Sequence, residues 1–104
     1  KEGVLVPYPG RVLRVGVRGE DVRVLQNYLN YIAKSYPDLP AVETDGVFGT
    51  ATQKAVTAFQ QKFGISATEG RVNALTWRAI ASVYEDLYNG NVVARGQYPG
   101  YEIS

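Results

Sequence analysis

The chain has 104 residues, 45% of them hydrophobic and 20% charged, so it is long enough for one soluble globular domain and too short for two independent cores. Eleven basic and ten acidic side chains give a formal net charge of +1, which provides no field to attract nucleic acid. Because cysteine and histidine are both absent, disulfides, thiol catalysis and the usual zinc sites are excluded, and we expect neither a metal nor a cofactor.

No apolar run reaches the length of about 18 residues that a membrane span needs, so a membrane partner is not expected either. The sequence also lacks a signal-peptide pattern at Lys1, which we interpret as the start of a mature or excised fragment.

The first predicted element is a helix between Gly19 and Tyr36. Its apolar residues recur at spacings of three and four, which is typical of one buried helix face. These residues are Val22, Leu25, Leu29, Ile32, Ala33 and Tyr36. The helix should end before Pro37, and the two prolines of YPDLP should then force an extended or turning link that leads to Asp45.

Two further helices follow along the chain. One is predicted from about Thr50 to Phe63, with Gly64 in the position of a left-handed C-terminal cap. The other is predicted from about Ala74 to Tyr88, and the NG dipeptide directly after it should end it. The sequence therefore predicts an all-α fold, a compact three-helix bundle with extended N- and C-terminal segments.

A short sequence is repeated at the start of the last two helices. DGVFGTATQKAV, which begins at Asp45, aligns with EGRVNALTWRAI, which begins at Glu69. Each copy should form a turn followed by a helix, so that Phe48 and Val72 occupy equivalent packing positions. Asp45 should accept hydrogen bonds from the backbone amides ahead of it in an Asx-type turn. Whether this loop also contacts a ligand stays open.

The N-terminal caps of these two helices have alternatives. Gly49 and Asn73 both suit an N-cap position, although Thr50 with Gln53 is also typical of a capping box.

A second repetition predicts the domain boundaries. YPGRVLR at residues 8–14 is matched by YPGYEIS at residues 98–104. We interpret the chain as one unit of a tandem array, with residues 1–12 an extended segment, 13–90 the domain, and 91–104 a linker with the start of the next repeat. The alternative is that so short a match arose by chance.

Three stretches resemble one known family. GVRGEDVRVLQNYLN, DGVFGTATQKAVTAFQQKFGI and EGRVNALTWRAI are similar in order and spacing to the peptidoglycan-binding domain of bacterial cell-wall hydrolases. Two features depart from the family pattern: the link before Asp45 is longer, and Glu69 and Asn73 stand where Asp and Gly are commoner. The YPG and YPDLP motifs further resemble tandem repeats of spore-forming Gram-positive bacteria, including spore cortex-lytic types.

This resemblance implies non-catalytic binding of peptidoglycan, both its glycan strand and its stem peptide, by a secreted protein of the wall or cortex. The module would bring an attached catalytic domain to this substrate. The candidate ligand-binding residues are Gln26, Asn30, Tyr31, Asp45, Phe48, Gln60 and Trp77. Amides match the amide-rich ligand, and aromatic faces match its sugars.

Four of these candidate residues have a structural alternative. Gln26 and Gln60 would bond the backbone of the loops between the helices, and Phe48 and Trp77 would pack in the core. Tyr31, placed on the far side of the first helix from its apolar face, is the better candidate for a solvated aromatic.

Two other functions compete with wall binding. A protein-interaction or spacer domain would pack against a neighbouring domain. The predicted helical fold resembles the regulatory pro-segments of some metalloproteases, but those use a cysteine that this chain lacks. A lytic enzyme would need a catalytic constellation. The carboxylates at equivalent places, Asp45 and Glu69, are better explained as turn acceptors than as an acid and base pair.

Overall fold

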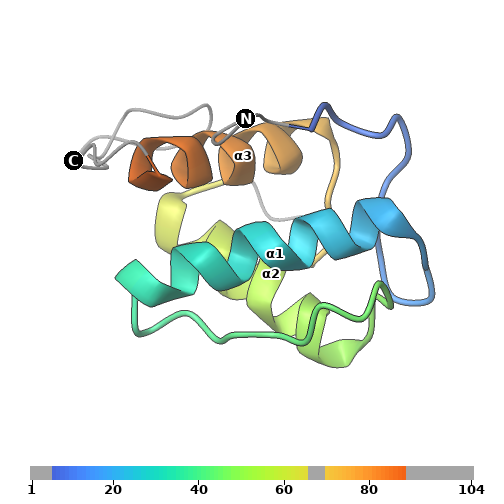
Figure 1. Cartoon of the computed structure of the whole chain (residues 1–104), viewed down its shortest axis with the longest axis horizontal. Coiled ribbons are helices and arrows are strands. Elements are labelled where there is room, and N and C mark those ends of the chain that lie inside the picture. The colour runs from blue at the N-terminus through green and yellow to red at the C-terminus, as the bar shows by residue number, and fades with distance from the viewer. Residues whose placement is uncertain (1–5, 66–69, 89–104) are drawn as a thin grey trace.

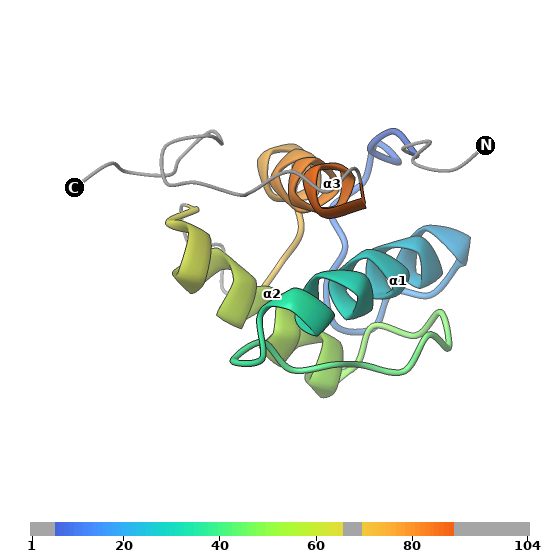
Figure 2. The same cartoon turned by 60° about the vertical axis from the view of Figure 1, so that its left-hand side comes forward.

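The computed structural model describes residues 6–65 and 70–88, and this part of the chain forms three α-helices. α1 spans Glu20–Ser35, α2 spans Thr50–Phe63 and α3 spans Ala74–Tyr88. Figure 1 shows α3 above α1, with α2 crossing behind and below, and Figure 2 shows the same bundle nearly along the axis of α3. Within the described ranges there are two isolated β-bridges and no strand, so the all-α prediction is confirmed.

The helix ends follow from local sequence. α1 ends at Ser35, ahead of Pro37, and α2 ends at Phe63, followed by the C-cap Gly64, which adopts φ 69° and ψ 26°. The next amide, that of Ile65, donates to the carbonyl of Gln60 at 2.9 Å, which is the long bond of a Schellman cap. The NG dipeptide predicted to end α3, and the tail predicted to begin another repeat, lie outside the described residues.

The N-terminal caps differ between α2 and α3. Asn73 caps α3 through its side chain, whose Oδ1 accepts a hydrogen bond from the amide of Thr76 at 2.9 Å. Gly49 caps α2 with backbone alone and no side-chain hydrogen bond, so the capping-box alternative at Thr50 and Gln53 is wrong.

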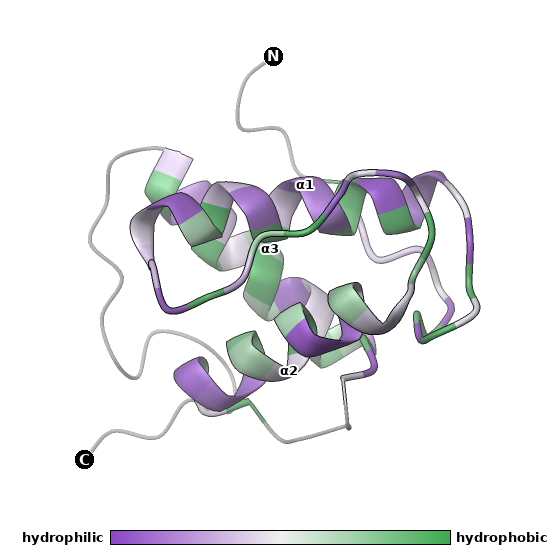
Figure 3. Ribbon diagram, turned by 90° about the horizontal axis from the view of Figure 1, so that it is seen from below, coloured by the Kyte–Doolittle hydropathy of each residue, from purple (hydrophilic) through white to green (hydrophobic). Residues whose placement is uncertain are grey.

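One core lies between the three helices, and α1 packs mainly against α3. Hydrophobic and hydrophilic residues alternate along each helix in Figure 3, as expected of amphipathic helices. Phe48 and Val72, the equivalent positions of the repeated sequence, are both fully buried, which confirms their predicted equivalence. The largest fully buried side chains are Trp77, Phe48, Phe59 and Phe63.

The segment before α1 connects the turns that precede α2 and α3. Leu13 exchanges two backbone hydrogen bonds with Val72, at 3.0 and 2.8 Å. A few residues later, the amide of Gly16 donates to the carbonyl of Phe48, and the amide of Phe48 donates to the carbonyl of Val17, each at 2.9 Å. One extended segment therefore pairs with both turns and fixes them relative to each other.

The start of the described chain also packs on the bundle. The indole Nε1 of Trp77 donates to the carbonyl of Val6 at 3.0 Å, and the amide of Val6 donates to the hydroxyl of Tyr28 at 2.9 Å. The ring of Tyr8 meets Trp77 edge-on, with ring centroids 6.3 Å apart. The described part of the predicted N-terminal segment thus contacts both α1 and α3; the domain boundaries themselves stay predictions.

Replacing Gly70 by alanine should destabilise the fold. Gly70 adopts φ +79°, and an added Cβ would lie 2.5 Å from Cγ of Gln53 and 3.0 Å from its carbonyl oxygen. We expect Gly70→Ala to lower the free energy of unfolding by about 1–3 kcal/mol, measured by urea denaturation. Gly49→Ala is the matched control, since no atom lies within 4 Å of its added Cβ, and equal losses in the two variants would contradict the prediction.

Candidate functional site

The turn that begins at Asp45 is held by a buried side chain of α1. Gln26 is 1% exposed, and its Oε1 accepts a hydrogen bond from the amide of Gly46 at 2.9 Å. Its Nε2 lies 3.0 Å from the carbonyl of Val47, 3.1 Å from Oδ1 of Asp45 and 3.1 Å from the hydroxyl of Thr52. Both ends of this carboxamide are therefore engaged inside the protein.

The turn before α3 repeats the arrangement with a glutamine from α2. Gln60 is 2% exposed, and its Oε1 accepts from the amide of Gly70 at 3.3 Å. Its Nε2 lies 3.0 Å from the carbonyl of Arg71 and 3.2 Å from the hydroxyl of Thr76. Glu69 lies outside the described residues.

The two networks match position by position along the repeated sequence. Gly46 corresponds to Gly70, and both adopt a positive φ, 76° and 79°. Thr52 corresponds to Thr76, and each hydroxyl contacts the glutamine of the preceding helix. The repeated sequence is thus a repeated structure, in which α1 and α2 each supply a carboxamide to the turn that follows.

Four of the predicted ligand-binding side chains are buried. Gln26, Gln60, Phe48 and Trp77 are between 0 and 2% exposed, so they do not present their side chains at the surface. The glutamines bond the loop backbone, and the two aromatic residues pack in the core, as their structural alternatives required. These four side chains therefore shape the surface from within.

Asn30 is also engaged internally. Its Nδ2 donates to the carbonyl of Val42 at 2.6 Å, and its Oδ1 accepts from the amide of Val42 at 2.7 Å. These two hydrogen bonds between the side-chain carboxamide and the backbone hold the long link between α1 and α2 against α1. The link is fastened further by Lys62 on α2, whose Nζ lies 3.0 Å from Oδ2 of Asp38.

Asp45 is exposed at the edge of a groove of about 560 Å³. Its Oδ1 accepts from the amide of Val47 at 3.0 Å, which confirms the predicted Asx-type turn. This bond and the hydrogen bond from Gln26 hold the pKa of Asp45 below its usual value. The link between α1 and α2 supplies one wall of the groove, through residues that include Ala41, Val42 and Glu43, and the first turn of α2 supplies another.

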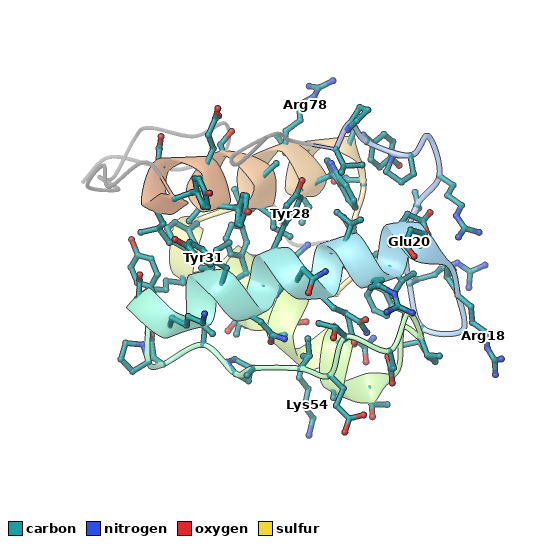
Figure 4. All side chains as sticks on the ribbon, viewed as in Figure 1. Arg18, Glu20, Tyr28, Tyr31, Lys54 and Arg78 are labelled. Carbon is teal, nitrogen blue, oxygen red and sulfur yellow. The ribbon has the colours of Figure 1, made fainter. Side chains whose placement is uncertain are left out.

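Four tyrosines gather where α1 faces α3. Figure 4 shows Tyr28 and Tyr31 both extending from α1 toward α3. The ring centroid of Tyr84 lies 4.6 Å from that of Tyr28 and 5.1 Å from that of Tyr31, and Tyr88 lies 6.0 Å from Tyr84. Burial against these neighbours raises the pKa of Tyr84 above its ordinary value.

Beside these rings lies a groove of about 410 Å³, which we call the tyrosine groove. Its lining residues are Val6, Val24, Asn27, Tyr28, Asn30, Tyr31, Lys34 and Tyr84. The ammonium of Lys34 lies over the ring of Tyr31, 5.5 Å from its centroid.

The position of Tyr31 differs from the sequence prediction. It was expected on the far side of α1 as a solvated aromatic, but it is half-buried and faces α3 together with Tyr28, three residues earlier. Tyr84 and Lys34 were not predicted from the sequence as parts of this surface. The spacing of three between Tyr31 and Lys34 placed them on one helix face, but nothing in it indicated that α3 lies alongside.

Two negative findings hold for the described residues. They contain no group of three or more His, Cys, Asp or Glu side chains placed to hold a metal ion. None of the helices in these ranges is long and apolar enough to cross a membrane.

The comparison with known families decides the identity of the fold. The profile of the peptidoglycan binding domain matches residues 18–80, which include α1, α2, both turns and the first half of α3. The chain belongs to the peptidoglycan-binding domain family. Among solved structures, it is similar to the crystal structure of the SleB N-terminal domain, with a TM-score of 0.62 and 32% sequence identity over 74% of this chain and 97% of that one. No curated protein sequence matches it.

Removing a buried glutamine from this peptidoglycan-binding domain should cost stability. Gln26→Ala leaves the amide of Gly46 and the carbonyl of Val47 without their partner, so we expect a loss of about 1–3 kcal/mol in the free energy of unfolding. Gln61→Ala, at an exposed position of α2, is the matched control and should change stability by less than about 0.5 kcal/mol. Chemical denaturation compares them, and equal small effects would show that the buried carboxamide is dispensable.

The Asp45 turn should also weaken in acid. Because the folded-state pKa of Asp45 lies below 3.8, its ionised form stabilises the fold above that pH, and this contribution is lost as pH falls through the lowered value. We expect Asp45→Asn, which cannot titrate, to lose stability less steeply than wild type between about pH 5 and pH 2. Asp21 and Asp38, whose pKa values are also lowered, should leave a residual acid dependence in both proteins. Denaturation curves of both proteins over this pH range test the prediction. Equal losses in the free energy of unfolding for wild type and Asp45→Asn would contradict it.

Proposed function

We propose that this domain binds peptidoglycan without catalysing a reaction and brings an attached hydrolase to the wall or spore cortex. The observation that carries the proposal is the family match over residues 18–80, a range in which both turns are held by buried carboxamides. The similarity to the N-terminal domain of SleB supports a module that is joined to another part of a larger protein.

Three finer parts of the proposal have separate support. The spore cortex of a Gram-positive bacterium is favoured by the resemblance of the YPG and YPDLP motifs. The tandem array is favoured by the second YPG motif at residues 98–100, in the part of the chain outside the described residues. A non-catalytic role is favoured by the absence of histidine and cysteine from the whole sequence.

Tandem copies would matter because a single module of this kind binds weakly. A contact surface of a few aromatic and polar side chains supports a dissociation constant in roughly the micromolar to millimolar range. On a polymeric wall, a second linked copy binds at high effective concentration, so two units should be retained more strongly than one.

Sedimentation with insoluble peptidoglycan tests the proposal. The purified chain and a linked two-unit protein are each mixed with walls of vegetative cells and with spore cortex, beside an unrelated helical domain of similar size. We expect both proteins to pellet with at least one of these materials, the two-unit protein more completely. If both stay in the supernatant, the domain does not bind peptidoglycan, and capture of its own parent protein would then favour the spacer role.

The same mixtures test for catalysis. Soluble muropeptides are measured in the supernatant after incubation, and we expect none beyond the level of the unrelated helical domain. Release of muropeptides by the purified chain would identify a lytic enzyme instead.

A further inference from the structure

We propose that the tyrosine groove holds an N-acetylated sugar of the glycan strand, with Lys34 placed for a carboxylate attached to that strand. This inference rests on the proposed function and assigns it to one face of the domain. The groove, of about 410 Å³, lies within the usual range of small-molecule sites, roughly 300–1,000 Å³.

The aromatic residues of the groove suit a sugar ring. One face of an N-acetylhexosamine is formed by C–H groups, which pack well against tyrosine rings, while its rim carries hydroxyls that tyrosine hydroxyls can bond. Tyr31 and Tyr84 line the groove with their rings at 68° to each other, and both are half-buried. Each therefore combines a fixed orientation with remaining exposure.

An exposed amide adds the polar part of the site. Asn27 lies one residue before Tyr28 on α1, lines the groove, and has no hydrogen-bond partner among the described residues. A carboxamide offers both a donor and an acceptor, which matches the acetamido group of the sugar. Asn30, in contrast, uses both ends of its carboxamide to bond the backbone of Val42, so it forms a fixed part of the groove wall.

A second lysine and tyrosine pair shows what is particular to the groove. Outside the groove, Lys62 lies over the ring of Tyr36, 5.1 Å from its centroid, but its ammonium is also paired with Asp38 at 3.0 Å. Lys34 lies over Tyr31 in the same way and has no carboxylate partner within the described residues. It is also the one charged residue among those that line the groove. Peptidoglycan carries carboxylates on its stem peptides and on lactyl groups that bear no peptide, so the ammonium of Lys34 is complementary to it in charge.

Binding of two soluble probes by the purified chain tests the site. The probes are a neutral tetramer of N-acetylglucosamine and carboxylate-bearing muropeptides released from walls by lysozyme, and calorimetry measures both affinities. We expect Tyr31→Ala to weaken both by about tenfold and Tyr36→Ala, the matched control, to leave both unchanged. Lys34→Ala should weaken the muropeptides more than the tetramer. Binding of muropeptides with none of the tetramer would overturn the sugar assignment.

Folding of each variant is followed by circular dichroism and thermal unfolding. If Tyr31→Ala fails to fold, Asn27→Ala replaces it, because this side chain is exposed and makes no hydrogen bond within the described residues. Asn27→Ala should weaken the binding of both probes. Folded variants that bind as wild type does would overturn the proposal.

Sedimentation with insoluble walls separates this inference from the proposed function. If the wild-type chain does not sediment with the walls, both the proposed function and this inference are overturned. If the wild-type chain sediments with walls and Tyr31→Ala and Asn27→Ala sediment equally well, the proposal of peptidoglycan binding stands. Only the assignment of the ligand to the tyrosine groove is then overturned.

Discussion

This fold depends on one hydrogen bond that is made once in each turn. It joins a buried glutamine carboxamide to the backbone amide of a glycine with a positive φ. Gln26 and Gln60 each bond one turn on both sides, at its amide and its carbonyl. In a buried setting such bonds are strong, and their loss leaves several polar groups unpaired. Every buried side-chain nitrogen and oxygen of the described residues has a partner. The two turns determine where α2 and α3 begin and where the segment before α1 can form its backbone hydrogen bonds with them.

This constraint separates the residues that identify the family from those that can meet a ligand. The glutamines, Phe48 and Trp77 belong to the recognisable motif, yet all are buried. Family membership therefore determines the fold, whereas binding depends on side chains that the fold leaves at the surface. The tyrosine groove and the groove beside Asp45 are two such surfaces, and they lie on either side of the contact between Asn30 and Val42. The first offers aromatic faces and a cation, and the second offers carboxylates.

The predictable parts of the structure were those determined by local chemistry. Pro37 and Gly64 end their helices through their own backbone preferences, and the repeated sequence placed Phe48 and Val72 in equivalent positions before any contact was known. The direction of Gln26 and the partner of Asn30 depend on segments more than ten residues away, so the helical period left them open. Tyr31 was misplaced for the same reason, because its environment is made by α3. The prediction of Asp45 as a hydrogen-bond acceptor in a turn was confirmed, because this role needs only the next two residues.

We propose that the ligand contacts the tyrosine groove and that the buried turns are structural, and an NMR titration tests this division most directly. Backbone amide shifts of the purified chain are followed while soluble muropeptides are added. We predict that the shifts change around Tyr31, Lys34 and Tyr84 and stay constant at Gly46 and Gly70. Changes centred on the two glycines, with the tyrosine groove unaffected, would contradict the account and return the ligand to the motif turns.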